Sequence, residues 1–173
     1  RMPPSLGKPA LKTLALVLLL LAAPLLGAVL ITKAGAQPHW STARWDSAGL
    51  LPDPAGHPEP LVRVLVARTW GWKAAFAVHS WIVLKPAGAV AYERWDVVGW
   101  GVDRGLPAVR RNIRPADGYW AGSPPEIVAA LDGAAAEATI PKLRAAIASY
   151  PHGHEYRLWP GPNSNSFVAH LLR

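Results

Sequence analysis

Residues 74–85 read AAFAVHSWIVLK and residues 90–100 read VAYERWDVVGW. Both stretches are rich in β-branched and aromatic residues, and the Pro-Ala-Gly sequence of residues 86–88 stands between them. This pattern is typical of a β-hairpin, in which a short turn joins two antiparallel strands. Because successive side chains of a strand point to opposite faces, we expect His79 and Trp81 to share one face of the sheet.

The sequence on either side extends this hairpin into an α+β domain, with a small antiparallel sheet and packed helices. Residues 61–68 (LVRVLVAR) have the β-branched composition of a further strand. Residues 101–123 have the composition of a long loop. We expect one domain, since domains commonly contain about 100–200 residues.

Residues 126–150 have the apolar spacing of a helix, with Ile127 and Leu131 four positions apart. Gly133 and Pro141 interrupt the pattern, because both residues disfavour a helix interior. We therefore predict two short helices in this region and not one.

The C-terminal segment combines an extended stretch, a turn and a helix. Residues 156–159 are predicted to be extended, and residues 160–163 (PGPN) to form a turn. Ser164 or Asn165 is the predicted N-cap of a final helix, because short polar side chains accept hydrogen bonds from the first turn.

The N-terminal segment has the properties of a membrane-spanning helix. Residues 13–32 carry no charge, and 20 residues of helix span roughly 30 Å, which is the thickness of the hydrocarbon core of a bilayer. A cleaved signal peptide is the alternative, since residues 34–36 (Ala-Gly-Ala) resemble a processing site. Basic residues precede the segment, which favours a cytoplasmic N-terminus at residues 1–12.

This topology places an irregular connector at residues 33–60 and an extracytoplasmic α+β domain at residues 61–173. The connector contains Trp40 and Trp45, which suit either the membrane interface or packing on the domain. We expect membrane lipids as partners.

Charge and composition exclude several other classes of protein. The net charge is +7, but four of the 18 basic residues precede residue 37, and the remaining 14 face 11 acidic residues. This modest surplus is not the basic stripe of a duplex-binding protein, so we expect no nucleic-acid partner. The chain has no cysteine, which excludes disulfides, thiolate metal sites and a cysteine nucleophile.

His79 and Ser164 form the most informative pair of candidate catalytic residues. A serine at a helix N-terminus lies near unpaired backbone N–H groups that can hold an oxyanion, and a strand-borne imidazole can act as its base. Asp96 or Glu93 on the neighbouring strand is a candidate to orient the imidazole. The structural alternative is a capping serine and a hydrogen-bonded core histidine.

Candidate binding residues lie elsewhere along the chain. Two asparagines in the PGPNSNSF run, Asn163 and Asn165, are candidates to donate to a substrate carbonyl. Three arginines of the long loop suit lipid phosphate or an acidic partner: Arg110, Arg111 and Arg114. Three tryptophans suit a carbohydrate or lipid cleft: Trp81, Trp120 and Trp159. Each set has a structural alternative in a turn, a solvated loop or a core. The sequence His152-Gly153-His154 is too sparse for a metal site, so we predict neither a metal nor a cofactor.

Four motifs of the chain resemble one family of bacterial proteins. They are FAVHSWIV at residues 76–83, VVGWG at residues 97–101, DGYWAG at residues 117–122 and WPGPNSNSF at residues 159–167. The chain resembles the domain-of-unknown-function family numbered 3750 over about residues 38–173, and the last motif is the most specific. The resemblance implies a bacterial protein with an N-terminal membrane segment, and therefore an inner-membrane chain with a periplasmic domain.

A remoter similarity concerns circularly permuted papain-like enzymes, among them the PPPDE peptidases and the lecithin–retinol acyltransferase group. In these enzymes a strand histidine precedes a nucleophilic cysteine at a helix start. The resemblance implies that His79 occupies the position of the base and Ser164 that of the cysteine. The chain departs from the pattern here, because it has a serine, Ser164, where these enzymes have the nucleophilic cysteine.

Three functions follow as expectations. The first is a non-catalytic accessory subunit of a larger membrane complex of respiratory or photosynthetic type, with other membrane-protein subunits as partners. The second is a membrane-anchored periplasmic hydrolase or acyltransferase of serine type. The third is a ligand-binding module of the cell envelope.

Overall fold

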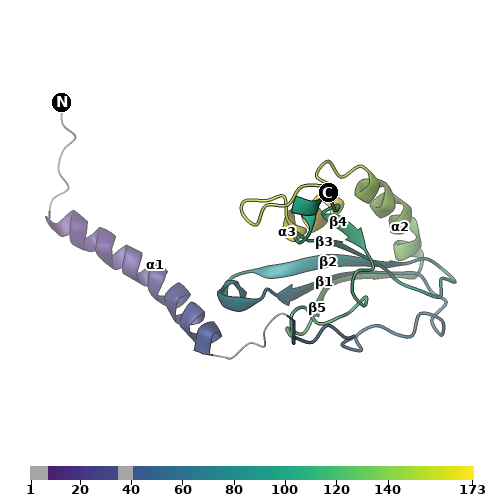
Figure 1. Cartoon of the computed structure of the whole chain (residues 1–173), viewed down its shortest axis with the longest axis horizontal. Coiled ribbons are helices and arrows are strands. Elements are labelled where there is room, and N and C mark those ends of the chain that lie inside the picture. Colours follow the sequence, from purple (N-terminus) through teal and green to yellow (C-terminus); the bar gives the residue numbers. More distant parts are fainter. Residues whose placement is uncertain (1–7, 35–40) are drawn as a thin grey trace.

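The computed structural model describes residues 8–34 and 41–173 (Figure 1). An N-terminal helix precedes an antiparallel sheet with two further helices. The elements follow in the order α1 (Lys8–Ala34), β1 (Leu61–Arg68), the 3-10 helix η1 (Gly71–Ala75), β2 (Val78–Lys85), β3 (Glu93–Val97), the 3-10 helix η2 (Val102–Arg104), β4 (Val109–Arg111), β5 (Glu126–Asp132), α2 (Gly133–Ala148) and α3 (Ser164–Leu171).

The sheet has five antiparallel strands in the order β4-β3-β2-β1-β5, and it confirms the predicted α+β class. Strands β1 and β2 pair along their whole lengths, with Leu65 opposite Trp81 and Ala67 opposite His79. The predicted hairpin is formed by β2 and β3, in which Ile82 lies opposite Trp95.

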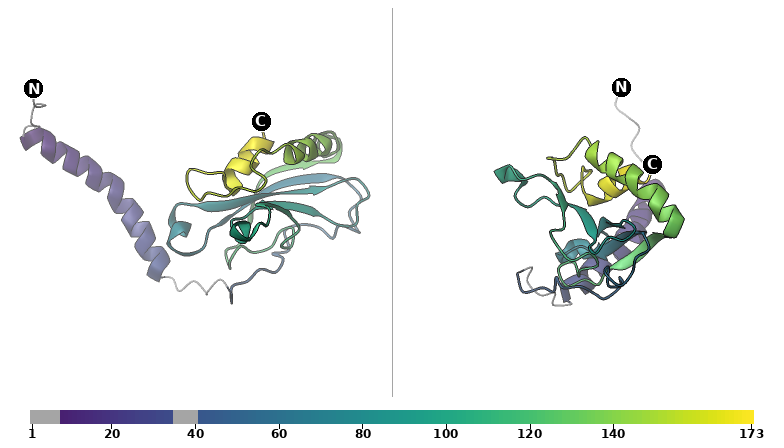
Figure 2. Two further views of the ribbon diagram at one scale, coloured as in Figure 1. Left: turned by 45° about the horizontal axis from the view of Figure 1, so that its top comes forward. Right: turned by 90° about the vertical axis from the view of Figure 1, so that its right-hand side faces the viewer.

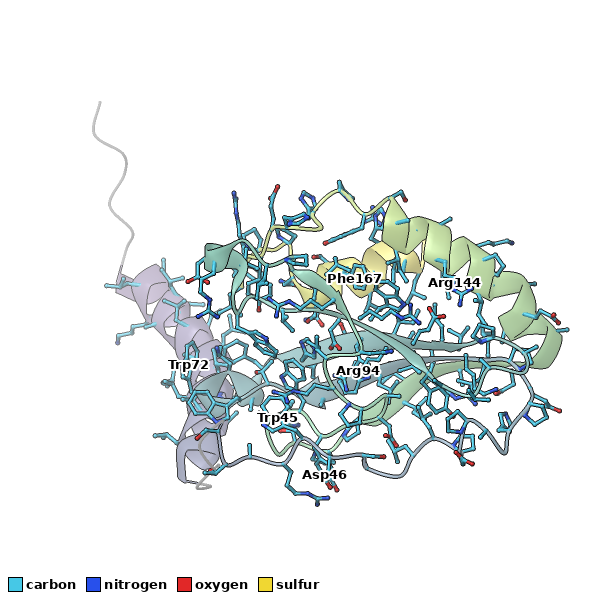
Figure 3. All side chains as sticks on the ribbon, turned by 45° about the vertical axis from the view of Figure 1, so that its right-hand side comes forward. Trp45, Asp46, Trp72, Arg94, Arg144 and Phe167 are labelled. Carbon is cyan, nitrogen blue, oxygen red and sulfur yellow. The ribbon has the colours of Figure 1, made fainter. Side chains whose placement is uncertain are left out.

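Each face of the sheet is covered by a different kind of structure. On one face, α2 and α3 pack on β1 and β2, as Figure 2 shows, and Phe167 and Ile140 are buried there. On the other face, irregular segments supply Trp45, Leu51 and Trp120, and no helix takes part in that cluster. Figure 3 shows Phe167 near α3, and Arg94 and Trp45 on the opposite side of the strands. The loop-covered face therefore carries the polar side chains of β2 and β3, among them His79 and Asp96, whereas Ser164 begins α3 on the other face.

Residues 126–150 differ from the prediction of two helices. Residues 126–132 form the edge strand β5, and α2 continues without a break through Pro141. The i, i+4 spacing of Ile127 and Leu131 fits a strand as well as a helix, because four is an even number of residues and also close to one helical turn. Pairing with β1 decides between the two structures.

Smaller differences lie at the ends of elements. The first hairpin strand begins at Val78 and not at residue 74, because residues 71–75 form η1. The final helix is capped by Asn163 and not by Ser164 or Asn165. The Asn163 side chain accepts hydrogen bonds from the backbone N–H groups of Asn165 and Ser166, at 3.0 and 3.1 Å, and Ser166 completes a capping box.

Helix α1 contains the uncharged stretch predicted to span a membrane. The segment Pro9–Leu30 is long and apolar enough to cross a bilayer, and none of this span is buried in the domain core. A membrane anchor and a signal sequence share these properties. Trp40, in the predicted connector, lies outside the described residues, whereas Trp45 packs on the domain.

The capping box of α3 leads to a first prediction. Asn163→Ala removes the acceptor for two backbone N–H groups and lowers the free energy of unfolding by about 1 kcal/mol. Asn163→Asp keeps the acceptor at the positive end of the helix dipole but loses the donor to the Leu158 carbonyl, so its stability lies between that of the Ala variant and that of the wild type. Thermal unfolding followed by tryptophan fluorescence measures both variants. Equal stability of the Ala variant and the wild type would contradict the role of this cap.

Candidate functional site

A fully buried ion pair lies on the loop-covered face of the sheet. Arg94 and Asp96 are both on β3 and both 0% exposed. Nε of Arg94 donates to Oδ2 of Asp96 at 2.7 Å, and Nη2 donates to Oδ1 at 3.1 Å. The remaining guanidinium nitrogen donates to the carbonyl of Pro115 at 2.7 Å. This bidentate geometry compensates for the desolvation of both charges.

His79 is attached to the same carboxylate from β2. Its Nε2 lies 2.9 Å from Oδ1 of Asp96, and the residue is only 6% exposed. Because an ionised carboxylate can only accept, Nε2 carries the proton and Nδ1 keeps its lone pair. Asp96 thus fixes the tautomer and the orientation of the imidazole, whereas Glu93, the other predicted orienting residue, ion-pairs with Arg144 and lies away from His79.

Burial and hydrogen bonding shift the pKa values of both groups downward. Desolvation lowers the pKa of His79 below its usual 6.5, although Asp96 opposes the shift. Burial alone would raise the pKa of Asp96, but the hydrogen bond from His79 and the charge of Arg94 lower it below 3.8. His79 is therefore neutral and Asp96 ionised at neutral pH.

Aromatic rings surround the imidazole of His79. The rings of His79 and Trp120 are stacked with centroids 3.5 Å apart and planes 8° apart. Trp81 lies 5.8 Å away on the same face, and the guanidinium of Arg94 covers the Trp81 ring at 4.0 Å. Trp100 stacks on Trp120 in turn, at 5.6 Å. A continuous aromatic column therefore runs from the buried ion pair to the surface.

Ser164 is buried at the first position of α3, and its hydroxyl faces the backbone of β2. The backbone N–H of Ser80 donates to the Ser164 Oγ over a long 3.5 Å. Within the described part of the chain, no hydrogen bond joins Ser164 to His79. The predicted nucleophile and base are thus neighbours in space without the contact that activates a serine.

A cavity of about 790 Å³ includes His79, Trp120 and Ser164 in its wall. Its further aromatic lining residues are Trp45, Trp70, Trp100 and Tyr156. Three cationic side chains also line it, and no carboxylate does: Lys73, Arg104 and Arg114. None of these three cations forms an ion pair within the described residues.

The comparisons with known proteins concern this same part of the chain. Residues 59–173 match the family model described as "Protein of unknown function (DUF3750)". The chain belongs to this family. Neither the curated proteins nor the solved structures contain a match. The similarity to permuted papain-like enzymes therefore remains a hypothesis.

The matched region includes every candidate residue of the sequence analysis, but the structure brings only some of them together. Cavity-lining residues among them are His79, Trp120, Arg114, Asn163, Ser164 and Asn165. The two asparagines already use their side chains to hold the fold, since Asn163 caps α3 and the Asn165 amide accepts from Ser80 Oγ at 2.8 Å. Their amides therefore shape the wall of the cavity.

The other candidates lie away from the cavity. Trp81 is completely buried and donates to the carbonyl of Ala116 at 2.9 Å, whereas Trp159 is 87% exposed. Arg110 donates to the carbonyls of Trp100 and Pro107. Within the described residues, no group of three metal-ligating side chains occurs, and His152 instead faces Glu155 at 3.5 Å.

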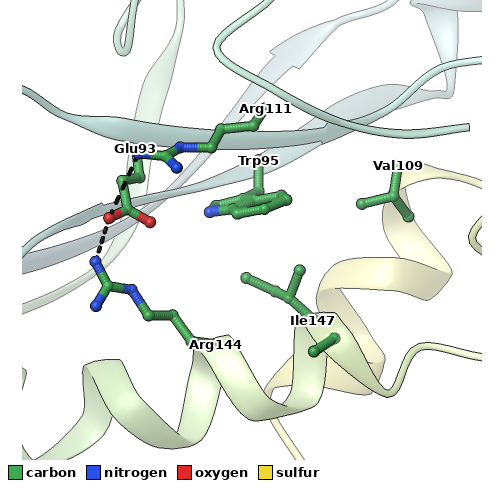
Figure 4. A pocket seen from close by; sticks show the side chains of 7 residues that line it. Glu93, Trp95, Val109, Arg111, Arg144 and Ile147 are labelled. Carbon is green, nitrogen blue, oxygen red and sulfur yellow. Dashed lines mark hydrogen bonds and ion pairs between the residues drawn. The ribbon is translucent and has the colours of Figure 1, made fainter. Parts of the chain in front are cut away.

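Arg111 lines a second, shallower groove of about 390 Å³ between β3, β4 and α2 (Figure 4). Glu93 lies there between Arg144 and Arg111, and the Trp95 ring forms the floor. The carboxylate is already neutralised by two arginines. This groove is therefore explained by the packing of α2 on the sheet.

Sequence reasoning missed several residues of the main cavity. Lys73 belongs to η1, which the pattern assigned partly to a strand, and Trp70 precedes this helix as its N-cap. Gly99 lies so close to the Tyr156 ring that an added Cβ would be 2.5 Å from it. The motif VVGWG contained this signal, because a glycine between large residues indicates close approach of another segment.

The low pKa of His79 leads to a second prediction. The unfolded chain binds a proton near pH 6.5 and the native His79 does not, so the free energy of unfolding falls as the pH is lowered below 6.5. Each such group contributes a slope of at most about 1.4 kcal/mol per pH unit. Protonation of the Asp96 carboxylate lowers the free energy of unfolding further only below about pH 3.8, the ordinary pKa of an aspartate.

His79→Gln keeps a donor to Asp96 but cannot titrate, so its unfolding energy changes less between pH 7 and pH 5. Urea unfolding at several pH values measures the difference between the two proteins. Identical slopes would show that native His79 takes up a proton as easily as the unfolded chain.

Proposed function

We propose that the domain is a ligand-binding module whose cavity takes an anionic molecule with a flat or apolar portion. One observation carries the proposal: the cavity combines stacked tryptophans with three cations, and among the described residues these cations have no ion pair and the wall has no carboxylate. A volume of about 790 Å³ is that of a pocket for a small organic ligand.

The electrostatics support an anion as the ligand. Burial and the nearby charge of Arg94 lower the pKa of Arg114, whose guanidinium lies 4.0 Å above the ring of Trp45. An anion beside Arg114 would relieve this unfavourable environment. The charge of Asp96 only partly opposes this lowering of the pKa, and its oxygens are already used by Arg94 and His79.

The aromatic column supports an apolar or flat portion. Trp100 is 45% exposed at the outer end of the column, whereas Trp120 is 7% exposed. A planar group placed against Trp100 extends the stack, and an alkyl chain gains from burial on the same surface. The cavity thus offers separate places for the charge and for the apolar part.

A second candidate function is hydrolysis or acyl transfer. It is favoured by the His79–Asp96 hydrogen bond of 2.9 Å, which orients an imidazole beside the N-terminus of α3. Against it stands the lack, among the described residues, of a hydrogen bond between Ser164 and His79; the Ser164 Oγ only accepts from the Ser80 backbone N–H at 3.5 Å. The third function, an accessory subunit of a membrane complex, stays a prediction that rests on the apolar helix α1.

Binding of 2-naphthalenesulfonate tests the first function, since this probe carries one planar ring system and one anion. The full chain in nanodiscs binds the probe, and Trp100→Ala or Arg114→Gln weakens the affinity about tenfold, the effect of one lost stacking or charged contact. Arg111→Gln is the matched control, because Arg111 lines the other groove. Isothermal titration against empty nanodiscs provides the measurement. No binding, or equal binding by all variants, would refute the proposal.

A fluorophosphonate probe separates binding from serine catalysis. It reacts with activated serines, so the binding function predicts no labelling of the wild type. Labelling that disappears in Ser164→Ala and in His79→Gln would establish the catalytic alternative instead. Mass spectrometry of the intact chain detects the adduct.

A further inference from the structure

The 3-10 helix η1 and the residues beside it present large apolar side chains to the surface. Trp72 is 52% exposed and Phe76 is 56% exposed, and their rings lie 5.5 Å apart. Trp70 and Val78 are 39% and 38% exposed. These four residues, with Lys73, are called the η1 surface below. Large apolar side chains gathered on one exposed surface mark an interaction site.

The η1 surface lies against one end of α1. Helix α1 contacts η1, as Figures 1 and 3 show for the segment around Trp72. Residues 27–29 are partly covered, whereas the rest of the described span from residue 9 to residue 26 is exposed. Residues 27–29 form the last turn of the apolar span Pro9–Leu30. The η1 surface is therefore level with the end of the apolar span.

This level corresponds to the lipid–water interface when α1 crosses a bilayer. Tryptophan is enriched there because its ring is apolar and its N–H remains hydrated. Lysine suits the same depth, because its alkyl stem lies among apolar groups while its ammonium reaches headgroup phosphates. The composition of the η1 surface thus matches the environment that α1 gives it.

The cavity opens beside the same surface. Trp70, Lys73 and Val78 belong both to the η1 surface and to the cavity wall, whereas Trp72 and Phe76 belong only to the surface. A molecule in the headgroup layer next to η1 is therefore next to the mouth of the cavity. The cations of the wall select a negative headgroup, and the tryptophans accept part of an acyl chain.

We propose that the η1 surface inserts into the lipid–water interface and that the cavity takes an anionic phospholipid directly from that leaflet. The lipid part rests on the proposed binding function, whereas the insertion of η1 does not. A bilayer, and not a second protein, is the occupant, because the η1 surface continues the apolar surface of α1.

The insertion is tested with single-cysteine variants, which the absence of native cysteine makes specific. Trp72→Cys and Phe76→Cys are labelled with nitrobenzoxadiazole in the full chain, which is reconstituted in vesicles of phosphatidylcholine and phosphatidylglycerol. Lys142→Cys, on the exposed side of α2, is the control. Spin-labelled lipids quench the labels at 72 and 76 several-fold more than the label at 142. Equal quenching at all three positions overturns the insertion and leaves η1 for a protein partner.

The origin of the ligand is tested with photoactivatable phosphatidylglycerol. It is supplied either as a long-chain lipid in the nanodisc or as a water-soluble dioctanoyl form. The double variant Trp72→Ser/Phe76→Ser lowers crosslinking from the nanodisc about tenfold. A loss of this size is expected when two aromatic rings no longer bury part of their surface in the bilayer. It leaves crosslinking of the dioctanoyl form unchanged, because neither residue lines the cavity.

The outcomes separate the two proposals. An equal loss in both arms would show that Trp72 and Phe76 are needed for the fold, and would overturn delivery from the leaflet. No crosslinking of either form to the wild type would overturn the lipid ligand, even if the labels at 72 and 76 are quenched. Binding of naphthalenesulfonate without lipid crosslinking would leave the binding module standing with a soluble ligand.

Discussion

The buried carboxylate of Asp96 is the constraint on which the loop-covered face depends. A charge at 0% exposure is tolerated only where every oxygen has a partner, and two side chains, Arg94 and His79, meet this requirement. Arg94 needs partners in its turn, and it finds them in the Pro115 carbonyl and the Trp81 ring. One ionised group thus fixes β3, β2 and the long loop relative to each other, and with them the position of His79.

The two faces of the sheet divide stability and recognition between them. The helix-covered face is closed by apolar packing around Phe167, whereas the loop-covered face carries the ion pair, the aromatic column and the cations. Asn165 joins α3 to β2 beside the cavity, because its amide accepts from Ser80 Oγ and donates to the carbonyl of Val78. The start of α3 is therefore both a structural joint and part of the cavity wall.

Elements that depend on local sequence patterns could be predicted from the sequence, whereas elements that depend on pairing between distant segments could not. The hairpin, the final helix and the neighbourhood of His79 with Asp96 followed from alternation and from adjacent strands. The strand at residues 126–132 could not be predicted, because an i, i+4 apolar pair fits the period of a helix and that of a strand. Pairing with β1 decides between them. Of the cavity cations only Arg114 was a candidate from the sequence; Lys73 in η1 and Arg104 in η2 were missed, because only the tertiary fold brings these segments together.

The way in which Asp117 closes the loop-covered face has a consequence for the order of folding. Its carboxylate accepts from Ser47 Oγ and the Leu50 N–H at 2.6 Å, and from the Leu51 N–H at 3.2 Å, so these bonds join segments 66–70 residues apart. Contacts this distant in sequence form late, after local hairpins. During synthesis, the segment around Trp45 leaves the ribosome well before its partner exists. This wall of the cavity therefore closes after the local β2–β3 hairpin, as does the docking of α3 on β2, whose hydrogen bonds join residues 84–87 positions apart.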